Sequence, residues 1–189
     1  MRILAVLLAV VALAVTAPAR AVYLEPSPAQ VAEAVEEGRA SITREEFGQE
    51  WLVRLPGGEE VRVTTPFARV ALAARQAAFK GEPLEEREIQ GQLDRGRGRI
   101  QFLVAVHGPR VDFARWYAAV LRVGQREVKA SFIQNERTAL RLDDGRYLAR
   151  NIYAFPTEGL APTGAVTLVV RSREGKEVLR VPIDLGAMR

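Results

Sequence analysis

Three arginines separated by single glycines form the most distinctive charged segment of the sequence, Asp94-Arg95-Gly96-Arg97-Gly98-Arg99. Between Arg95 and Arg150 there are twelve basic residues against five acidic ones. A guanidinium group recognises carboxylate and phosphate oxygens through paired hydrogen bonds. We therefore predict that Arg95, Arg97 and Arg99 bind an anionic partner.

A second interpretation of the same arginines is structural. Residues 25–60 contain nine glutamates against only three arginines. The basic and acidic parts of the chain would then pair with each other and contribute to stability rather than to binding. Nucleic acid is disfavoured as a partner because aromatic residues are not interleaved with these basic ones.

The residue types of the common catalytic sites are few. His107 is the only histidine, and it precedes Gly108-Pro109 at the end of an apolar run, which is typical of a turn or surface histidine. None of the four serines lies in the G-x-S-x-G pattern of a hydrolase nucleophile. We predict no catalytic residue, and we expect a protein that is not an enzyme.

Paired carboxylates are the remaining route to catalysis, since one acid and one base can hydrolyse a glycosidic bond. Adjacent glutamates such as Glu36-Glu37 and Glu85-Glu86 diverge on a helix or strand and do not face one substrate. Carboxylates could still be assembled by the fold. The rival hypothesis is therefore a cofactor-independent hydrolase that acts on envelope polymers.

Metal and cofactor sites have little support in the sequence. The chain has no cysteine, which excludes disulfides, cysteine-bound zinc, iron–sulfur clusters and lipid attachment to cysteine. Asp143-Asp144-Gly145 lacks the spaced oxygen ligands of a calcium loop and is better explained as a hairpin turn. We expect no metal and no cofactor.

Four large aromatic residues could stack on sugar rings or line an interface. They are Trp51, Trp116, Tyr117 and Tyr153. Large aromatic residues at strand positions more often contribute to the core, and this is the interpretation that we favour.

Residues 1–21 have the pattern of an export signal. Arg2 precedes an apolar run of 14 residues, Ile3 to Thr16, and small residues suited to cleavage follow at Ala19 and Ala21. A spanning helix needs about 20 apolar residues, so we expect cleavage after Ala21 or Ala19 and no integral membrane span afterwards. A retained signal anchor is the alternative. The predicted location is the bacterial periplasm or the medium.

Length and composition indicate a soluble globular protein. The chain has 189 residues, of which 48% are hydrophobic and 26% charged, and its net charge is +4. These values exclude a disordered chain and a polytopic membrane protein. A mature chain without residues 1–21 is long enough to form a core without disulfides.

The N-terminal part of the mature chain reads as helices with one hairpin. Ser27-Pro28 begins a helix that Gly38 should end, and Thr65-Pro66 begins a second that Gly81 should end. Pro83 is expected to begin a third. Residues 51–55 and 61–64 form a hairpin around Pro56-Gly57-Gly58.

After Arg97 the pattern changes to strands. They are predicted at residues 100–106, 128–133, 138–142, 147–152, 164–171 and 176–184. Residues 113–121 fit either a helix or a strand, and we favour the strand because Gly124-Gln125 would then form a turn. The segment Leu160-Ala161-Pro162 resembles the chain reversal before a late strand in immunoglobulin-like and fibronectin-like sandwiches, a likeness of fold that implies no function.

The predicted fold is therefore α+β, with N-terminal helices and one β-hairpin followed by a mostly antiparallel β-sandwich, of which an immunoglobulin-like arrangement is one form. The predicted division is a signal peptide at 1–21, a helical portion at 22–97 and a sandwich portion at 98–189, and the two portions could pack as a single domain. The predicted function is an exported, non-catalytic envelope protein that acts as a binding or structural module. Its expected partner is an anionic envelope component or another envelope protein.

Overall fold

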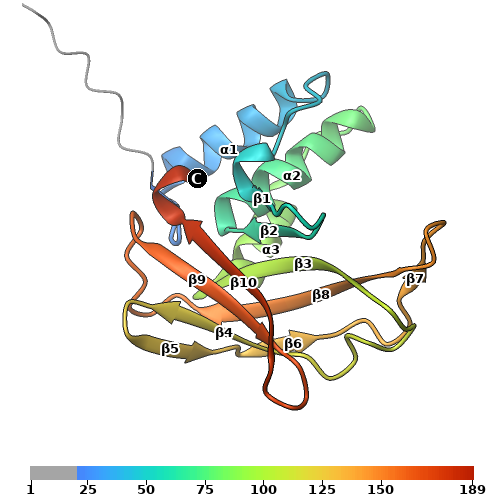
Figure 1. Ribbon diagram of the computed structural model, residues 1–189. Coiled ribbons are helices and arrows are strands. Elements are labelled where there is room, and N and C mark those ends of the chain that lie inside the picture. The colour runs from blue at the N-terminus through green and yellow to red at the C-terminus, as the bar shows by residue number, and fades with distance from the viewer. Residues whose placement is uncertain (1–20) are drawn as a thin grey trace, which may run out of the picture.

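The computed structural model describes residues 21–189, so the predicted signal peptide lies outside the described residues except for Ala21. Three α-helices accompany two antiparallel sheets (Figure 1). The helices are α1 (Pro28–Ala40), α2 (Pro66–Phe79) and α3 (Glu86–Gly96). This arrangement confirms the predicted α+β fold with a β-sandwich.

The larger sheet has six strands, in the order β1-β2-β3-β8-β6, with β7 also paired to β8. They are β1 (Leu52–Arg54), β2 (Glu60–Thr64), β3 (Arg99–Gly108), β6 (Phe132–Gln134), β7 (Leu140–Arg141) and β8 (Tyr147–Pro156). The smaller sheet has the order β10-β9-β4-β5. Its strands are β4 (Ala118–Val123), β5 (Arg126–Lys129), β9 (Ala165–Arg171) and β10 (Glu177–Asp184). Two short 3₁₀ helices, at Gln49–Trp51 and Leu185–Ala187, complete the fold.

The hairpin predicted in the N-terminal portion joins the large sheet. Strand β2 pairs antiparallel with β3 along its whole length, with Glu60 opposite Ala105 and Thr64 opposite Gln101. One core cluster includes buried residues from the helices, the hairpin and both sheets, among them Phe67, Val61 and Leu168. Strand pairing and core packing therefore both cross the predicted boundary at residues 97/98.

Helices α1 and α2 pack unusually closely at Gly38. This residue was predicted to end the first helix, but the helix continues to Ala40. Gly38 is buried against the backbone of Ala71, and a Cβ atom added to it would lie 2.8 Å from the Cβ of Ala74. The glycine therefore serves helix contact rather than helix termination.

The other helix ends follow their capping residues. Ser27 and Gln30 form the predicted capping box of α1, and Gly81 follows α2 with a φ of 74°. Helix α3 begins at Glu86 rather than Pro83, because the Glu88 carboxylate accepts a hydrogen bond from the Glu85 backbone N–H at 3.0 Å.

Two strand predictions need correction. Residues 128–133 form parts of two strands in different sheets, because the chain crosses after Lys129 and the Ser131 N–H then bonds the Ala154 carbonyl at 2.8 Å. The strand predicted at 138–142 is reduced to Leu140–Arg141 before the turn at Gly145. The strand favoured within 113–121 is present from Ala118 onwards, whereas residues 111–116 form turns.

Candidate binding sites

Two of the three predicted binding arginines, Arg95 and Arg99, lie close to Arg69, which the sequence did not predict as a binding residue. Arg95 is in the last turn of α3, Arg99 begins β3, and Arg69 is in α2. Arg95 and Arg99 are exposed and Arg69 is half-buried. We call Arg69, Arg95 and Arg99 the Arg69 cluster.

Two glycines explain how the chain assembles this cluster. Gly96 is buried where α3 meets the start of α2, and a Cβ atom there would lie 3.3 Å from both Pro66 Cα and Arg69 Cδ. Gly98 has a φ of 62°, which a side-chain-bearing residue rarely adopts, and so turns the chain sharply into β3. The segment from Asp94 to Arg99 is thus partly helix and partly a tight turn.

The positive charges of Arg95 and Arg99 act on Arg69. Burial lowers the pKa of Arg69, and the positive charges of Arg95 and Arg99 lower it further. Arg69 Nη2 donates a hydrogen bond of 2.6 Å to the Gln101 side-chain oxygen, a neutral acceptor. Within residues 21–189, no ion pair with a carboxylate involves any member of the cluster. The cluster is therefore a positive site without an internal counter-charge.

Arg97 has a different environment. Its Nη2 atom lies 2.7 Å from Asp94 Oδ1, so its charge is partly compensated. It lines a separate groove of about 360 Å³ between α3, Pro66 and the segment Leu24–Pro26. The structure thus places Arg95 and Arg99 together near Arg69, and Arg97 elsewhere.

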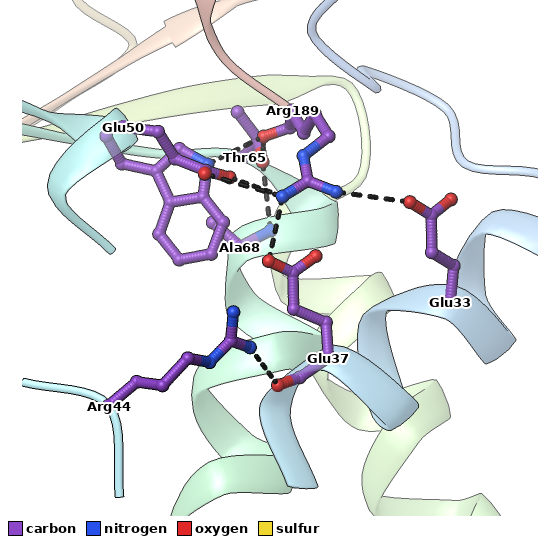
Figure 2. Close-up of polar contacts among 8 residues, drawn as sticks. Glu33, Glu37, Arg44, Glu50, Thr65, Ala68 and Arg189 are labelled. Atoms are coloured by element: carbon purple, nitrogen blue, oxygen red, sulfur yellow. Dashed lines mark hydrogen bonds and ion pairs between the residues drawn. The ribbon is translucent and has the colours of Figure 1, made fainter. Parts of the chain in front are cut away.

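A second arginine site, centred on Arg189, has carboxylate partners for its charge. Its guanidinium lies among three carboxylates, at 3.2 Å from Glu33, 2.7 Å from Glu37 and 3.3 Å from Glu50 (Figure 2). Its carbonyl oxygen accepts hydrogen bonds of 3.0 Å from the Trp51 indole and from the Thr65 hydroxyl. Burial lowers the pKa of Arg189, but its hydrogen bonds and charge interactions with Glu50 and Glu37 outweigh that effect and raise it.

The Arg189 cluster, which comprises Arg189, Glu33, Glu37 and Glu50, is also the assembly of carboxylates that the hydrolase hypothesis requires. Glu37 and Glu50 approach the same nitrogen atom, Nη2 of Arg189. In a glycosidase the space between the two carboxylates holds the scissile bond. Here it holds a guanidinium, so the arrangement connects α1, the 3₁₀ helix at Gln49–Trp51 and the last residue of the sequence.

His107 is within β3 rather than in the predicted turn. It pairs with Leu148 of β8 and is half-buried, with its ring near Gly58 of the β1–β2 hairpin. Its Nδ1 atom is buried and has no hydrogen-bond partner among residues 21–189. No group of three or more His, Asp or Glu side chains placed to hold a metal ion occurs in that range either.

The four aromatic residues divide into two kinds. Trp51 and Tyr153 are fully buried, as a core role predicts, and Tyr117 is half-buried. Trp116 is 59% exposed, so the core interpretation is wrong for this residue. It lies just before β4, at the end of the turns formed by residues 111–116.

Comparisons with known proteins identify no family for this chain. No family model matches it, and no curated protein matches its sequence. Among solved structures, it is similar to a protein of unknown function from Burkholderia pseudomallei K96243, with 11% identity, 82% of this chain and 88% of that chain covered, and a TM-score of 0.44. An IgNAR antibody domain C1 is similar over 48% of this chain and 79% of that one, with 10% identity and a TM-score of 0.31. Likenesses this slight carry no functional information.

Proposed function

We propose that the protein is an exported, non-catalytic binding module of the bacterial envelope, and that the Arg69 cluster binds an anionic envelope component. The observation that carries this proposal is that some arginines have carboxylate partners and others do not. Arg97 and Arg189 each have carboxylate partners, whereas Arg69, Arg95 and Arg99 are grouped without one in the described part of the chain.

Grouped like charges raise the free energy of the folded protein unless a counter-charge is supplied. A phosphate or carboxylate on a partner would supply it, and guanidinium groups are well suited to such oxygens. The half-buried position of Arg69 adds to the effect, because charges interact more strongly where water is partly excluded. The cluster is therefore best explained as a recognition site.

Export is the second component of the proposal and rests on the sequence of residues 1–21. Among residues 21–189, no helix is both long and apolar enough to cross a bilayer. Fractionation of producing bacteria, with mass determination of the purified N-terminus, tests this component directly. A product that retains residues 1–21 in the cytoplasm would contradict it.

Binding is tested with vesicles that contain phosphatidylglycerol and, separately, with polygalacturonate, which distinguish a phosphate from a carboxylate source. Replacing Arg69, Arg95 and Arg99 together with Gln should weaken binding to the preferred probe at least about tenfold at low salt. The remaining binding should depend less on salt, since exposed charges are screened within about 10 Å at 0.1 M ionic strength.

The matched control is the triple replacement of Arg39, Arg54 and Arg97 with Gln. These exposed arginines each have a carboxylate partner, and the change in net charge is the same. Their loss should alter binding by less than about twofold, in line with the small contribution of exposed ion pairs. Equal losses in the two triple variants would show that net charge, not the Arg69 cluster, determines binding.

A further inference from the structure

A second surface has the features of a protein-binding groove. It lies between residues Arg115–Tyr117, just before β4, and residues 133–137, which include the end of β6, and its volume is about 420 Å³. Its lining residues are Arg115, Trp116, Tyr117, Ile133, Gln134, Asn135 and Arg137. We call this feature the Trp116 groove.

The groove is held in shape by side chains on both of its walls. Asn135 donates hydrogen bonds to the carbonyl oxygens of Tyr117 at 2.7 Å and Arg115 at 3.3 Å, and it accepts one from the buried Tyr153 hydroxyl at 3.1 Å. The Trp116 ring has the guanidinium carbons of Arg115 and Arg173 at 5.1 Å and 5.7 Å from its centroid. A preorganised groove loses little entropy when a ligand binds.

The charges that line the groove are positive and uncompensated. Arg115 and Arg137 are exposed, and neither forms an ion pair within residues 21–189. Glu136 stands between two lining residues, and its carboxylate accepts a hydrogen bond from the Arg150 backbone N–H. Burial raises the pKa of Tyr117, and the charge of Glu174 raises it further. Glu174 also interacts with Arg110 and Arg173, so it does not neutralise the lining arginines.

An open strand edge borders the groove. Strand β6 ends the large sheet, pairs with β8 on one side and has no described strand on the other. All three of its residues are exposed, including Phe132 at 46% and Ile133 at 44%. An open edge offers unpaired backbone N–H and C=O groups that an added peptide strand can satisfy, while apolar side chains beside it provide contact area.

We propose that the Trp116 groove binds an extended acidic segment of another protein. Its carboxylates would pair with Arg115 and Arg137, its apolar side chains would pack on Trp116 and Ile133, and its backbone would extend the sheet at β6. A glycan chain has no backbone amide groups that could pair with the open edge of β6, so the observations favour a peptide. Two copies of this chain paired through β6 would bring their lining arginines together, and like charges disfavour that dimer.

The probe is a fluorescently labelled decapeptide of alternating Glu and Val, compared with the alternating Lys and Val decapeptide. Fluorescence anisotropy with the purified protein should show at least about tenfold tighter binding of the acidic peptide. Trp116 is the exposed one of two tryptophans, so acrylamide quenching of its fluorescence should decrease as the acidic peptide binds. The variant Trp116→Phe identifies that signal.

Replacing Arg115 and Arg137 together with Gln should reduce acidic-peptide binding at least about tenfold, because two charge-assisted contacts are lost. The control replaces Arg39 and Arg54, which are exposed and ion-paired elsewhere, and should change binding less than about twofold.

Failure of the acidic peptide to bind, or equal binding of the two peptides, would overturn the proposal. The proposal would also be overturned if polygalacturonate bound more tightly than the acidic peptide and Arg115→Gln/Arg137→Gln abolished that binding. Protection of Trp116 from acrylamide by self-association alone, without peptide, would overturn it as well. The Arg69, Arg95 and Arg99 variant should bind the peptide normally, which separates this test from that of the proposed function.

Discussion

The first turns of α2 separate two arginine clusters with opposite electrostatic character. Arg189 lies 5.6 Å from the Phe67 ring centroid and is surrounded by carboxylates, whereas Arg69, two residues further along α2, has two other arginines nearby. The pKa of Arg189 is raised by its partners, while burial and like charges lower that of Arg69. Both sites are centred on an arginine, so the difference comes from the side chains that the fold places around each one.

This difference separates stability from recognition. A charge that has its partners within the fold stabilises the fold and interacts only weakly with a ligand. A charge grouped with like charges costs folding free energy and gains from an external anion. The contrast predicts that mutations at the Arg189 cluster act mainly on stability, and that mutations at the Arg69 cluster act mainly on binding.

The largest effect is expected from Gly38→Ala, which would force apart the helices that position the glutamates around Arg189. An added Cβ atom meets the Ala71 backbone and the Ala74 side chain, so we expect the free energy of unfolding to fall by about 2–3 kcal/mol, as overpacking typically causes. Chemical denaturation measures this change. Far-UV circular dichroism should show the fold retained at low denaturant.

Gly91→Ala is the matched control for that prediction. Gly91 is inside α3, where an added Cβ atom would have nothing closer than the Arg95 guanidinium at 3.9 Å. Alanine is the better helix former, so this variant should gain up to about 1 kcal/mol. Losses of similar size in both variants would show that the close contact of α1 with α2 is not what makes Gly38 important.

Arg189→Met is expected to have the next largest effect. It leaves Glu33, Glu37 and Glu50 near one another without their common partner, while methionine keeps much of the apolar contact with Phe67. Breaking a fully buried ion pair costs about 3–5 kcal/mol of stability. Because the Arg189 side chain is 22% exposed, we expect the free energy of unfolding to fall by about 1–2 kcal/mol.

The loss in Arg189→Met should shrink at high salt, which screens the repulsion among the glutamates. Denaturation at low and high salt tests this, with Arg97→Met as the control at an exposed arginine that has one partner. An unchanged stability in Arg189→Met would remove the contrast between the two clusters, because neither would then contribute to the fold.

Local sequence signals predicted much of the fold and less of the sites. The capping box at Ser27 and Gln30, the turn at Gly145 and the strand β9 each depend on neighbouring residues, so the sequence alone could predict them. The role of Gly38 could not be predicted from the sequence, because it depends on Ala71, which is distant in sequence. The same applies to the crossing of the chain between β5 and β6.

The candidate sites show the same limit. Arg95 and Arg99 could be chosen from local charge density, but Arg69 joins them only through the packing of α2 on α3 at Gly96. One signal was present: Arg69 is the only charged residue among the first nine of α2 and interrupts an otherwise apolar run. Exposure of Trp116 had no local signal, since aromatic residues at such positions are usually covered.

The smallest effect on stability is expected at a third arginine cluster, whose charges have partners but are more exposed than those of Arg189 and Glu37. Glu127 of β5 lies 2.8 Å from Arg171 of β9 and 2.9 Å from Arg122 of β4. Hydrogen bonds from Arg171 and then Arg122 lower the pKa of Glu127 from 4.5 to about 2. A carboxyl group whose pKa is depressed in the folded state stabilises the fold above its unfolded pKa and loses that contribution as the pH falls. The contribution of Glu127 should therefore be complete above about pH 4.5 and disappear on acidification toward pH 2.

Titration of the Glu127 side-chain carboxyl by NMR should give a midpoint near 2, and Arg171→Gln should raise that midpoint more than Arg122→Gln, because Arg171 is the larger cause. Glu127→Gln should nevertheless destabilise the protein less than Arg189→Met at neutral pH, since water screens an exposed pair and the side chains lose entropy in forming it. A midpoint near 4.5 would contradict the pairing itself. A loss of stability as large as that of Arg189→Met would show that pairing alone, without burial, distinguishes a structural arginine from a binding one.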